Sequence, residues 1–351
     1  METTTVYAAK PYDITVGRGI LSQLGGKLKQ LFPRGRTVVI TDDNVEAIYG
    51  NVLRKSLDRA EIVHSFFIAD HGEGVKSLET FGEVMTYLQQ CKLTKTDFLI
   101  ALGGGTVGDL TGFAASCYLR GIPFVQVPTT LLAAVDASVG GKTALNLPTA
   151  KNQIGSFYQP ALVWCDYATL KTMDPLLYFD GIAEAIKMAV IGDTKLFDFL
   201  ATANIFDETE KIITACVALK ADIVAADETD TGQRQVLNLG HTLGHAIEAR
   251  SRYTVTHGQA VAIGMVKISE IGASHGFTQY DCGERIAELL QRFHLPTVCP
   301  YPLKELLPYI LHDKKRLEDD ISFIIPETVG CCRKVKVPFK KLPEFLGLRE
   351  D

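Results

Sequence analysis

Several features that would assign this chain to other protein classes are missing from its sequence. It has no run of 18 apolar residues, so we expect no membrane-spanning segment. Basic residues are not in excess: 36 Lys and Arg stand against 41 Asp and Glu, whereas proteins that bind nucleic acids or membrane surfaces need a basic face. The eight cysteines have no Cys-x-x-Cys spacing, and the first residues do not resemble a signal peptide, so we expect reduced thiols in the cytoplasm.

Glycine, in contrast, is concentrated in one stretch of the chain. Eight of the 30 glycines lie within residues 103–141. Charge is scarce there, because between Phe98 and Val135 only Asp109 and Arg120 are ionised. Since glycine lets other backbone segments approach closely, the stretch predicts a buried region with crowded backbone.

The hydrophobic pattern divides the 351 residues into two parts. In the first part apolar, β-branched runs alternate with helical patterns, which predicts a mostly parallel sheet covered on both faces. After about Asp166 helical patterns follow one another, so we place a domain boundary near residues 155–175 and expect a binding cleft between the domains. The expected strands are 37–40, 62–68, 98–102, 124–127, 162–165, 321–325 and 335–338, and the expected helices are 44–57, 77–90, 181–191, 208–226, 236–249, 258–275 and 282–293.

The strand at residues 98–102 runs directly into the sequence Gly-Gly-Gly-Thr-Val-Gly-Asp. Glycines at such a turn let backbone N–H groups approach a phosphate, and the following helix adds partial positive charge. The spacing is not that of the usual dinucleotide fingerprint, so a pyrophosphate-binding loop and a tight structural turn remain equally open. Thr129 and Thr130 end the next strand and could reach a ligand, although a helix N-cap is the favoured role of Thr130 by itself.

Charged residues within or after the apolar stretch need partners, because an unpaired buried charge is costly. Asp136, Lys142 and Lys151 could pair with one another, or the two lysines could hold a phosphorylated or carboxylated ligand. Lys220 and the basic segment at residues 312–316 are interpreted by default as solvated surface.

Three of the eight histidines fall within a short span. His241 and His245 share one helix face, and His257 precedes an apolar helix whose positive end should keep the ring neutral, the form that binds metal. Glu184, in another apolar helix, is a candidate carboxylate ligand, although the spacing alone favours a salt bridge to Lys187, three residues later. The histidine pair lacks the inner glutamate of a metalloprotease helix.

Six segments together resemble the sugar phosphate cyclases, and among these the 3-dehydroquinate synthase family, in order and spacing. They are GGGTVGDLTGF, YLRGIPFVQVPTTLLAAVDASVGGKTALN, AKNQIGSFYQP, GIAEAIK, LNLGHTLGHAIE and HGQAVAIGM. The resemblance implies a Rossmann-like α/β domain at residues 1–165 and a mainly helical domain at residues 166–351. It also implies conversion of 3-deoxy-D-arabino-heptulosonate 7-phosphate to 3-dehydroquinate and phosphate, with NAD and a divalent metal, zinc or cobalt, and a homodimer that binds no nucleic acid or membrane.

The resemblance further implies a role for individual residues. Those expected to bind the metal are Glu184, His241 and His257. Those expected to contact NAD are Asp42, Asn44, Glu73, Lys76, Gly105, Thr106, Val107, Gly108, Asp109, Thr129, Thr130, Lys142, Lys151, Thr169, Leu170, Lys171 and Thr172. Those expected to act on the substrate are Asp136, Lys142, Lys187, Lys220, Arg234, Asn238, His245 and one of Lys314 or Lys315.

Three positions depart from the usual pattern of the family. Ala137, Ala150 and Gln259 stand where the family usually has Ser, Gly and Glu. The change at Gln259 could weaken a contact to the metal-binding helix. Other readings are a cyclase acting on another sugar phosphate, such as a 2-deoxy-scyllo-inosose synthase or a sedoheptulose 7-phosphate cyclase, and an NAD- and metal-dependent alcohol or glycerol-phosphate dehydrogenase. Arg234 and the late lysines favour a carboxylated substrate.

Overall fold

The computed structural model describes residues 1–148, 150–313 and 320–348, so the expected substrate residues Lys314 and Lys315 lie outside the described part. Contacts divide the chain into two units, one formed by Met1–Asp174 with Thr209–Thr229 and the other by Pro175–Glu208 with Asp230–Asp351. This division differs from the bounds predicted from sequence at residues 166–174 and 209–229. Among the described residues, no helix is both long and apolar enough to cross a membrane.

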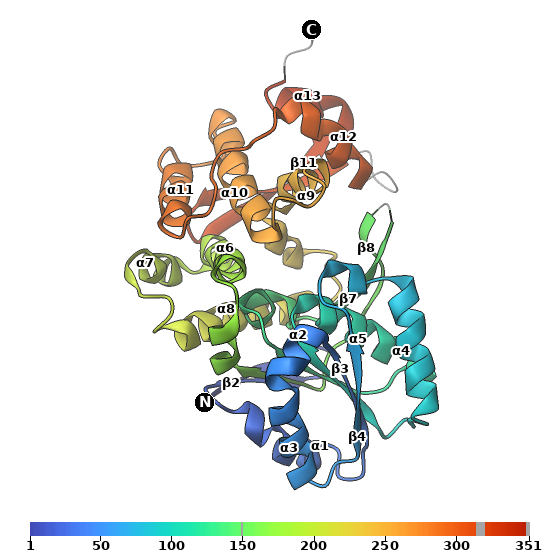
Figure 1. The fold of residues 1–351 in the computed structure, drawn as a ribbon. Coiled ribbons are helices and arrows are strands. Elements are labelled where there is room, and N and C mark those ends of the chain that lie inside the picture. The colour runs from blue at the N-terminus through green and yellow to red at the C-terminus, as the bar shows by residue number, and fades with distance from the viewer. Residues whose placement is uncertain (149, 314–319, 349–351) are drawn as a thin grey trace. The chain divides into compact units, whose positions relative to one another are not determined.

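A seven-stranded sheet forms the centre of the first unit (Figure 1). Every neighbouring pair is parallel except the first two strands, which are antiparallel. The expected parallel sheet is therefore confirmed, and the first two strands are additions that the sequence pattern did not reveal. In spatial order the strands are β1 (Glu2–Val6), β2 (Tyr12–Gly17), β9 (Leu162–Asp166), β6 (Phe124–Pro128), β5 (Phe98–Gly103), β3 (Thr37–Asp42) and β4 (His64–Ala69).

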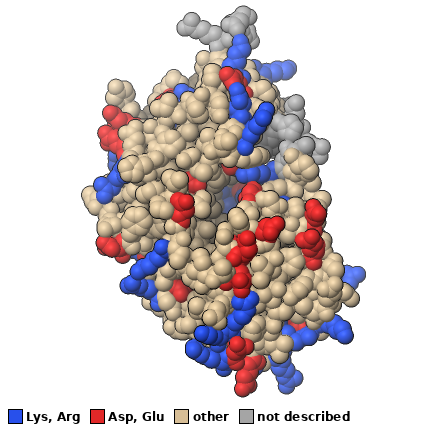
Figure 2. All heavy atoms as spheres, in the orientation of Figure 1, with Lys and Arg blue, Asp and Glu red and all other residues tan. Residues whose placement is uncertain are grey.

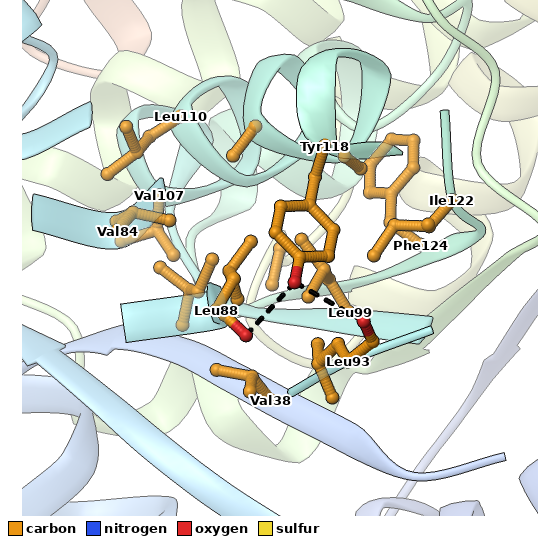
Figure 3. Packing of buried hydrophobic residues seen from close by; sticks show 14 of the residues in the cluster. Val38, Val84, Leu88, Leu93, Leu99, Val107, Leu110, Tyr118, Ile122 and Phe124 are labelled. Atoms are coloured by element: carbon orange, nitrogen blue, oxygen red, sulfur yellow. Dashed lines mark hydrogen bonds between the residues drawn. The ribbon is translucent and has the colours of Figure 1, made fainter. Parts of the chain in front are cut away.

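Alternate side chains of the central strands enter two separate cores, because successive residues of a strand point to opposite faces. On one face Ile100 of β5 packs with Leu28 of α1 (Leu24–Leu31) and Leu57 of α3 (Asn51–Arg59). On the other face Leu99 packs with Leu88 of α4 (Leu78–Gln90) and with residues of α5 (Gly105–Cys117). Figure 3 shows this second core, where the hydroxyl of Tyr118 donates hydrogen bonds to the carbonyl groups of Leu88 and Leu93.

The remaining elements of the first unit are short or lie outside the sheet. A π-helical stretch (η2, Glu46–Gly50) joins α2 (Asp43–Val45) to α3, within the single helix expected at residues 44–57. The others are 3-10 helices η1 (Leu21–Gln23), η3 (Glu73–Val75), η4 (Tyr118–Arg120) and η6 (Tyr167–Thr172), π-helix η5 (Ala133–Ala137), helix α8 (Thr209–Ala226) and the hairpin β7 (Lys142–Leu147) and β8 (Ala150–Phe157).

The second unit is mainly helical, as expected, with one late hairpin. The single helix expected at residues 236–249 is instead two helices: the first ends at Asn238, and Gly240, with a left-handed φ of 76°, is the N-cap of the second. A side chain at Gly240 would meet the Val261 carbonyl at 2.7 Å, so this break also brings the chain close to α10. The elements are α6 (Pro175–Gly192), α7 (Thr194–Thr202), η7 (Gln233–Asn238), α9 (His241–Arg250), α10 (His257–Ser274), α11 (Cys282–Arg292), α12 (Leu303–Asp313), β10 (Asp320–Thr328), β11 (Cys331–Pro338), η8 (Phe339–Lys341) and α13 (Leu342–Phe345).

Acidic and basic side chains are interspersed over the face drawn in Figure 2. This mixture accords with the small net charge of -5.

Two neighbouring glycines of α1 provide a test of the packing in the first unit. A methyl group at Gly25 would lie 2.0 Å from the Ser56 carbonyl oxygen, whereas one at Gly26 would meet nothing within 4 Å. We expect Gly25→Ala to destabilise the protein by about 1–3 kcal/mol through overpacking. Gly26→Ala should stabilise it by about 0.5–1 kcal/mol through helix propensity. Thermal unfolding of both variants checks this, and equal midpoints would contradict the packing of α1 on α3.

Candidate functional site

A buried carboxylate and two imidazoles converge in the second unit. Glu184 lies on α6 and is 1% exposed, while His241 and His257 are the first residues of α9 and α10. Glu184 Oε1 lies 3.2 Å from His257 Nε2 and 3.6 Å from His241 Nε2. One ligand atom from each of the three residues falls within 4.8 Å of the others, so the group can hold a metal ion. The sequence-predicted metal ligands are thus brought together.

The bonding of Glu184 favours a cation at this place. Neither of its carboxylate oxygens receives a hydrogen bond of normal geometry from the described residues. Lys187 Nζ lies 2.5 Å from Oε2, so the salt bridge considered as an alternative is present as well. Lys187 is 1% exposed, and the pair is fully buried. Lys187 thus offsets part of the cost of burying this carboxylate, and a divalent cation bound by Glu184 and the two imidazoles would offset more of it.

His257 lies between two carboxylates. Its Nε2 faces Glu184, and its Nδ1 lies 3.3 Å from Oε2 of Glu248, which is 3% exposed. Burial lowers the pKa of His257, but Glu184 and Glu248 outweigh it and raise the pKa to about 10. In the metal-free protein the two carboxylates thus oppose the effect of the helix end, and a metal would have to displace a proton from the ring. Burial, followed by the charge of Lys187, lowers the pKa of His241, which favours the neutral ring.

Glu248 is a functional candidate that sequence reasoning missed. A carboxylate on the second nitrogen of a metal-binding imidazole fixes its orientation and tautomer. The sequence did hold a signal, because Glu248 follows His245 by three residues and so shares its helix face. The exposed ring of His245 lies 5.4 Å from that of His241, centre to centre.

The other expected substrate residues of the second unit lie on the 3-10 helix η7, just before α9. Arg234 is 1% exposed, which is unusual for a guanidinium, and Asn238 is half-buried. A buried cation near the start of α9 suits recognition of an anionic group.

A second set of residues lies in the first unit, at the carboxyl ends of the parallel strands. Because β9, β6, β5 and β3 are neighbours in the sheet, the segments that follow them lie together at the carboxyl ends of these strands. Asp42 ends β3, and its carboxylate accepts a hydrogen bond from the Val45 N–H at the start of α2. After β9, the Thr169 carbonyl and the Thr172 hydroxyl both bond to the Tyr49 hydroxyl. The expected NAD residues Asp42, Asn44 and 169–172 therefore lie at the carboxyl ends of the strands, where ligands of such sheets bind.

The glycine turn follows β5, between the segments that follow β6 and β3. Gly104 is the N-cap of α5 but has no side chain, so the first N–H groups of the helix have no side-chain cap. Added methyl groups at Gly103 and Gly104 would meet Val107 at 2.7 Å and Thr130 at 3.1 Å. Close backbone packing and uncapped N–H groups at a helix start suit a phosphate.

The two threonines after β6 have different roles. The Thr130 hydroxyl accepts a hydrogen bond from Ala133 N–H, so the favoured helix-cap interpretation is confirmed. Thr129 is 4% exposed, and its hydroxyl has no hydrogen-bond partner within the described ranges. An unpaired buried hydroxyl beside the glycine turn is available to a ligand.

Charged residues expected at the NAD site pair beside α5, around the buried side chain of Lys76. Lys76 Nζ lies 2.6 Å from Asp109 Oδ2 and 2.6 Å from Asn152 Oδ1. Glu73 accepts a hydrogen bond of 3.2 Å from the Thr106 hydroxyl. Burial raises the pKa of Asp109, and its pairing with Lys76 opposes that shift. The structure thus joins four expected residues and adds Asn152, which sequence reasoning missed.

Asp136 pairs with Lys220 of α8, whose ammonium group also donates to the Asp136 carbonyl at 2.7 Å. Lys220 is 5% exposed, so its interpretation as solvated surface is wrong. Lys142 is exposed on β7 and Lys151 is half-buried on β8.

Comparison with known families gives matches along most of the chain. A family model described as 3-dehydroquinate synthase N-terminal matches residues 66–178, and one described as 3-dehydroquinate synthase C-terminal matches residues 181–316. The 3-dehydroquinate synthase of Enterococcus faecalis (strain ATCC 47077 / OG1RF) is 41% identical over 353 residues, which covers 99% of each chain. That of Geobacter sp. (strain M21) is 41% identical and covers 97% of each.

Solved structures share the fold at lower identity. A 2-deoxy-scyllo-inosose synthase complexed with carbaglucose-6-phosphate, NAD+ and Co2+ has a TM-score of 0.89 at 24% identity, over 98% of this chain and 99% of that one. A 2-epi-5-epi-valiolone synthase from Streptomyces hygroscopicus subsp. jinggangensis 5008, with NAD+ and Zn2+ bound, has a TM-score of 0.86 at 24% identity, over 95% of each chain. An iron-containing alcohol dehydrogenase from Thermotoga maritima has a TM-score of 0.66 at 20% identity, over 96% of this chain and 98% of that one.

Glu248→Gln tests whether this carboxylate orients His257. The amide keeps the size of the side chain but loses its charge, so we expect divalent-cation affinity to fall about 10- to 100-fold. Titration of the protein with Co2+, followed by visible absorption, measures the affinity. Glu270→Gln, at an exposed glutamate paired with Lys267 on α10, is the control and should bind as tightly as the unaltered protein. Equal affinity of all three proteins would contradict the role of Glu248.

Proposed function

The chain belongs to the 3-dehydroquinate synthase family, and we propose that it converts 3-deoxy-D-arabino-heptulosonate 7-phosphate to 3-dehydroquinate and phosphate. Membership confirms the resemblance found in the sequence. The reaction is a carbon–oxygen lyase step, the second of the shikimate pathway that leads to chorismate and the aromatic amino acids. The observation that carries the proposal is Glu184, a buried carboxylate without hydrogen bonds, held against two imidazoles.

Glu184, His241 and His257 fit a divalent metal in number and chemical type, and this set suits zinc or cobalt. With open coordination positions, such an ion supplies a Lewis acid for neighbouring sugar oxygens. Lys187 lies against Glu184 and limits the carboxylate to one arrangement. Glu248 contacts Nδ1 of His257, the ring nitrogen that does not face Glu184.

NAD fits the carboxyl ends of the parallel strands in the first unit. When bound, it supplies a transient oxidation of one sugar hydroxyl, which is reversed later in the same turnover. We infer that the uncapped N–H groups after Gly104 hold its pyrophosphate and that the Thr129 hydroxyl donates to it. The network of Lys76, Asp109 and Glu73 fixes the first turns of α5 beneath the cofactor. The remaining expected contacts are Asp42, Asn44, Thr130 and residues 169–172.

The substrate carries a phosphate and a carboxylate, and the chain offers cations for both. We assign Arg234, Lys142, Lys151 and His245 to neutralising these groups by charge-assisted hydrogen bonds. Oxidation of the neighbouring hydroxyl makes a C–H of the substrate acidic, and phosphate then leaves by β-elimination. The phosphate dianion can itself accept that proton, so the proposal needs no separate base. Asp136 and Lys220 pair with each other and contribute a polar wall.

Product analysis with the heptulosonate phosphate, NAD and Zn2+ tests the proposal. We expect phosphate and 3-dehydroquinate in equal amounts and no net formation of NADH, because the hydride returns to the substrate. Sedoheptulose 7-phosphate and glucose 6-phosphate should release no phosphate, since they lack the carboxylate that Arg234 is assigned to bind. Stoichiometric NADH would instead indicate a dehydrogenase, and phosphate release from either sugar phosphate would indicate another cyclase.

Assembly and location are further parts of the proposal. We infer a homodimer, by analogy with the family, which light scattering on the purified protein tests. All eight cysteines are free thiols, which supports a reducing compartment such as the cytoplasm.

His257→Ala should remove bound metal and activity together while the protein stays folded, because the ligand set loses one of its three members. Metal content, phosphate release and circular dichroism measure the three properties. His275→Ala, at the other end of the same helix, should keep both metal and activity. Full activity of His257→Ala would overturn its assignment as a ligand.

Thr129→Val separates a role in ligand binding from a role in stability. Its hydroxyl has no partner in the described structure, so valine should leave the unfolding midpoint unchanged or slightly higher. The free energy of NAD binding should become less favourable by about 0.5–1.5 kcal/mol, which is the net contribution of one hydrogen bond. Thr37→Val is the control. Thr37 also has an unpaired buried hydroxyl, but it lies at the amino end of β3, away from the carboxyl ends of the strands. Weaker NAD binding in both variants, or in neither, would contradict the assignment.

A further inference from the structure

Asp180 is a buried acid that neither the sequence patterns nor the family resemblance singled out. It lies on α6, one turn before Glu184, and is 6% exposed. Its Oδ1 accepts a hydrogen bond of 2.7 Å from the hydroxyl of Thr256, the N-cap of α10. The Thr256 side chain in turn accepts a hydrogen bond from the backbone N–H of Gln259. The side chain of one helix thus caps the start of another.

The two helices are in unusually close contact at this point. A methyl group at Gly258 would lie 2.4 Å from the Asp180 Cα and 2.6 Å from its carbonyl oxygen. Only a glycine therefore permits the first turn of α10 to rest on the backbone of α6. Glu184 follows on α6 and His257 stands at the start of α10, so this contact determines the separation of two of the three metal-binding side chains.

The negative charge of Asp180 also acts on the start of α10. The first turn of α10 contains no acidic residue, and Gln259 completes a neutral capping box by accepting a hydrogen bond from Thr256 N–H. A helix start is stabilised by nearby negative charge, which Asp180 supplies from α6. Asp180 therefore supplies from α6 the negative charge that the neutral Gln259 does not supply from within α10.

We propose that Asp180 is a positioning residue for the metal centre: by capping α10 from α6, it fixes His257 relative to Glu184. The inference rests on the proposed function, because it requires that these residues bind a divalent metal. Asp180 itself does not reach the metal. It acts through Thr256, the residue before His257, whose side chain accepts the hydrogen bond from the N–H of Gln259.

Titration of the full-length protein with Co2+, after chelation and dialysis, tests this role. Asp180→Asn should bind Co2+ about tenfold more weakly and with an altered visible spectrum, because His257 is no longer held in one position. In Asp180→Asn/Gln259→Glu a carboxylate returns to the first turn of α10, and the affinity and spectrum should largely recover. Asp193→Asn is the matched control, since Asp193 caps α7 in the same unit by accepting the Leu196 N–H at 2.9 Å but holds no metal residue.

The outcomes separate the possible failures. If the unaltered protein binds no Co2+, the metal centre of the proposed function is wrong, and the role of Asp180 falls with it. If the unaltered protein binds Co2+ and Asp180→Asn binds it equally well, only the role of Asp180 is overturned. A lower unfolding midpoint in both Asp180→Asn and Asp193→Asn, with weaker Co2+ binding in the former alone and rescue by the double variant, supports the proposal.

Discussion

Removal of a carboxylate from water costs several kcal/mol unless cations or hydrogen-bond donors replace the water. Glu184 is 1% exposed and sits in the nearly fully buried helix α6, so the second unit must supply that compensation. It does so with the ammonium group of Lys187 and with two imidazoles at the first positions of α9 and α10. A divalent cation is the ligand that such an arrangement best accommodates. The packing of α6, α9 and α10 therefore determines whether the site can bind a metal.

Glycines make that packing possible. A methyl group at Gly264 of α10 would lie 2.1 Å from the Gly240 carbonyl, and one at Gly258 would overlap the backbone of α6. Small residues serve the first unit in the same way, where the glycine turn leaves the first N–H groups of α5 without a side-chain cap. In both units, close backbone approach leaves polar groups in positions where an ion or a phosphate can complete their bonding.

Local sequence patterns predicted much of the fold and the composition of the site. Continuous apolar runs revealed β3 and β5, because both are buried on both faces, whereas β1 and β2 carry too weak a pattern. The contacts of Asp180 and Glu248 depend on helix packing, and no spacing in the chain encodes the approach of α6 to α10. The effect of Glu184 and Glu248 on the pKa of His257 could not be predicted for the same reason, since both carboxylates lie on other helices than α10.

The central claim is that Glu184 anchors a divalent metal, and thermal unfolding with and without Co2+ tests it most directly. A ligand that binds only the folded state raises the free energy of unfolding by about 2.7 kcal/mol at a concentration one hundred times its Kd, and so raises the unfolding midpoint. The account predicts that Co2+ raises the midpoint of the unaltered protein and leaves that of Glu184→Gln unchanged. Equal shifts in the two proteins, or no shift in the unaltered one, would contradict it.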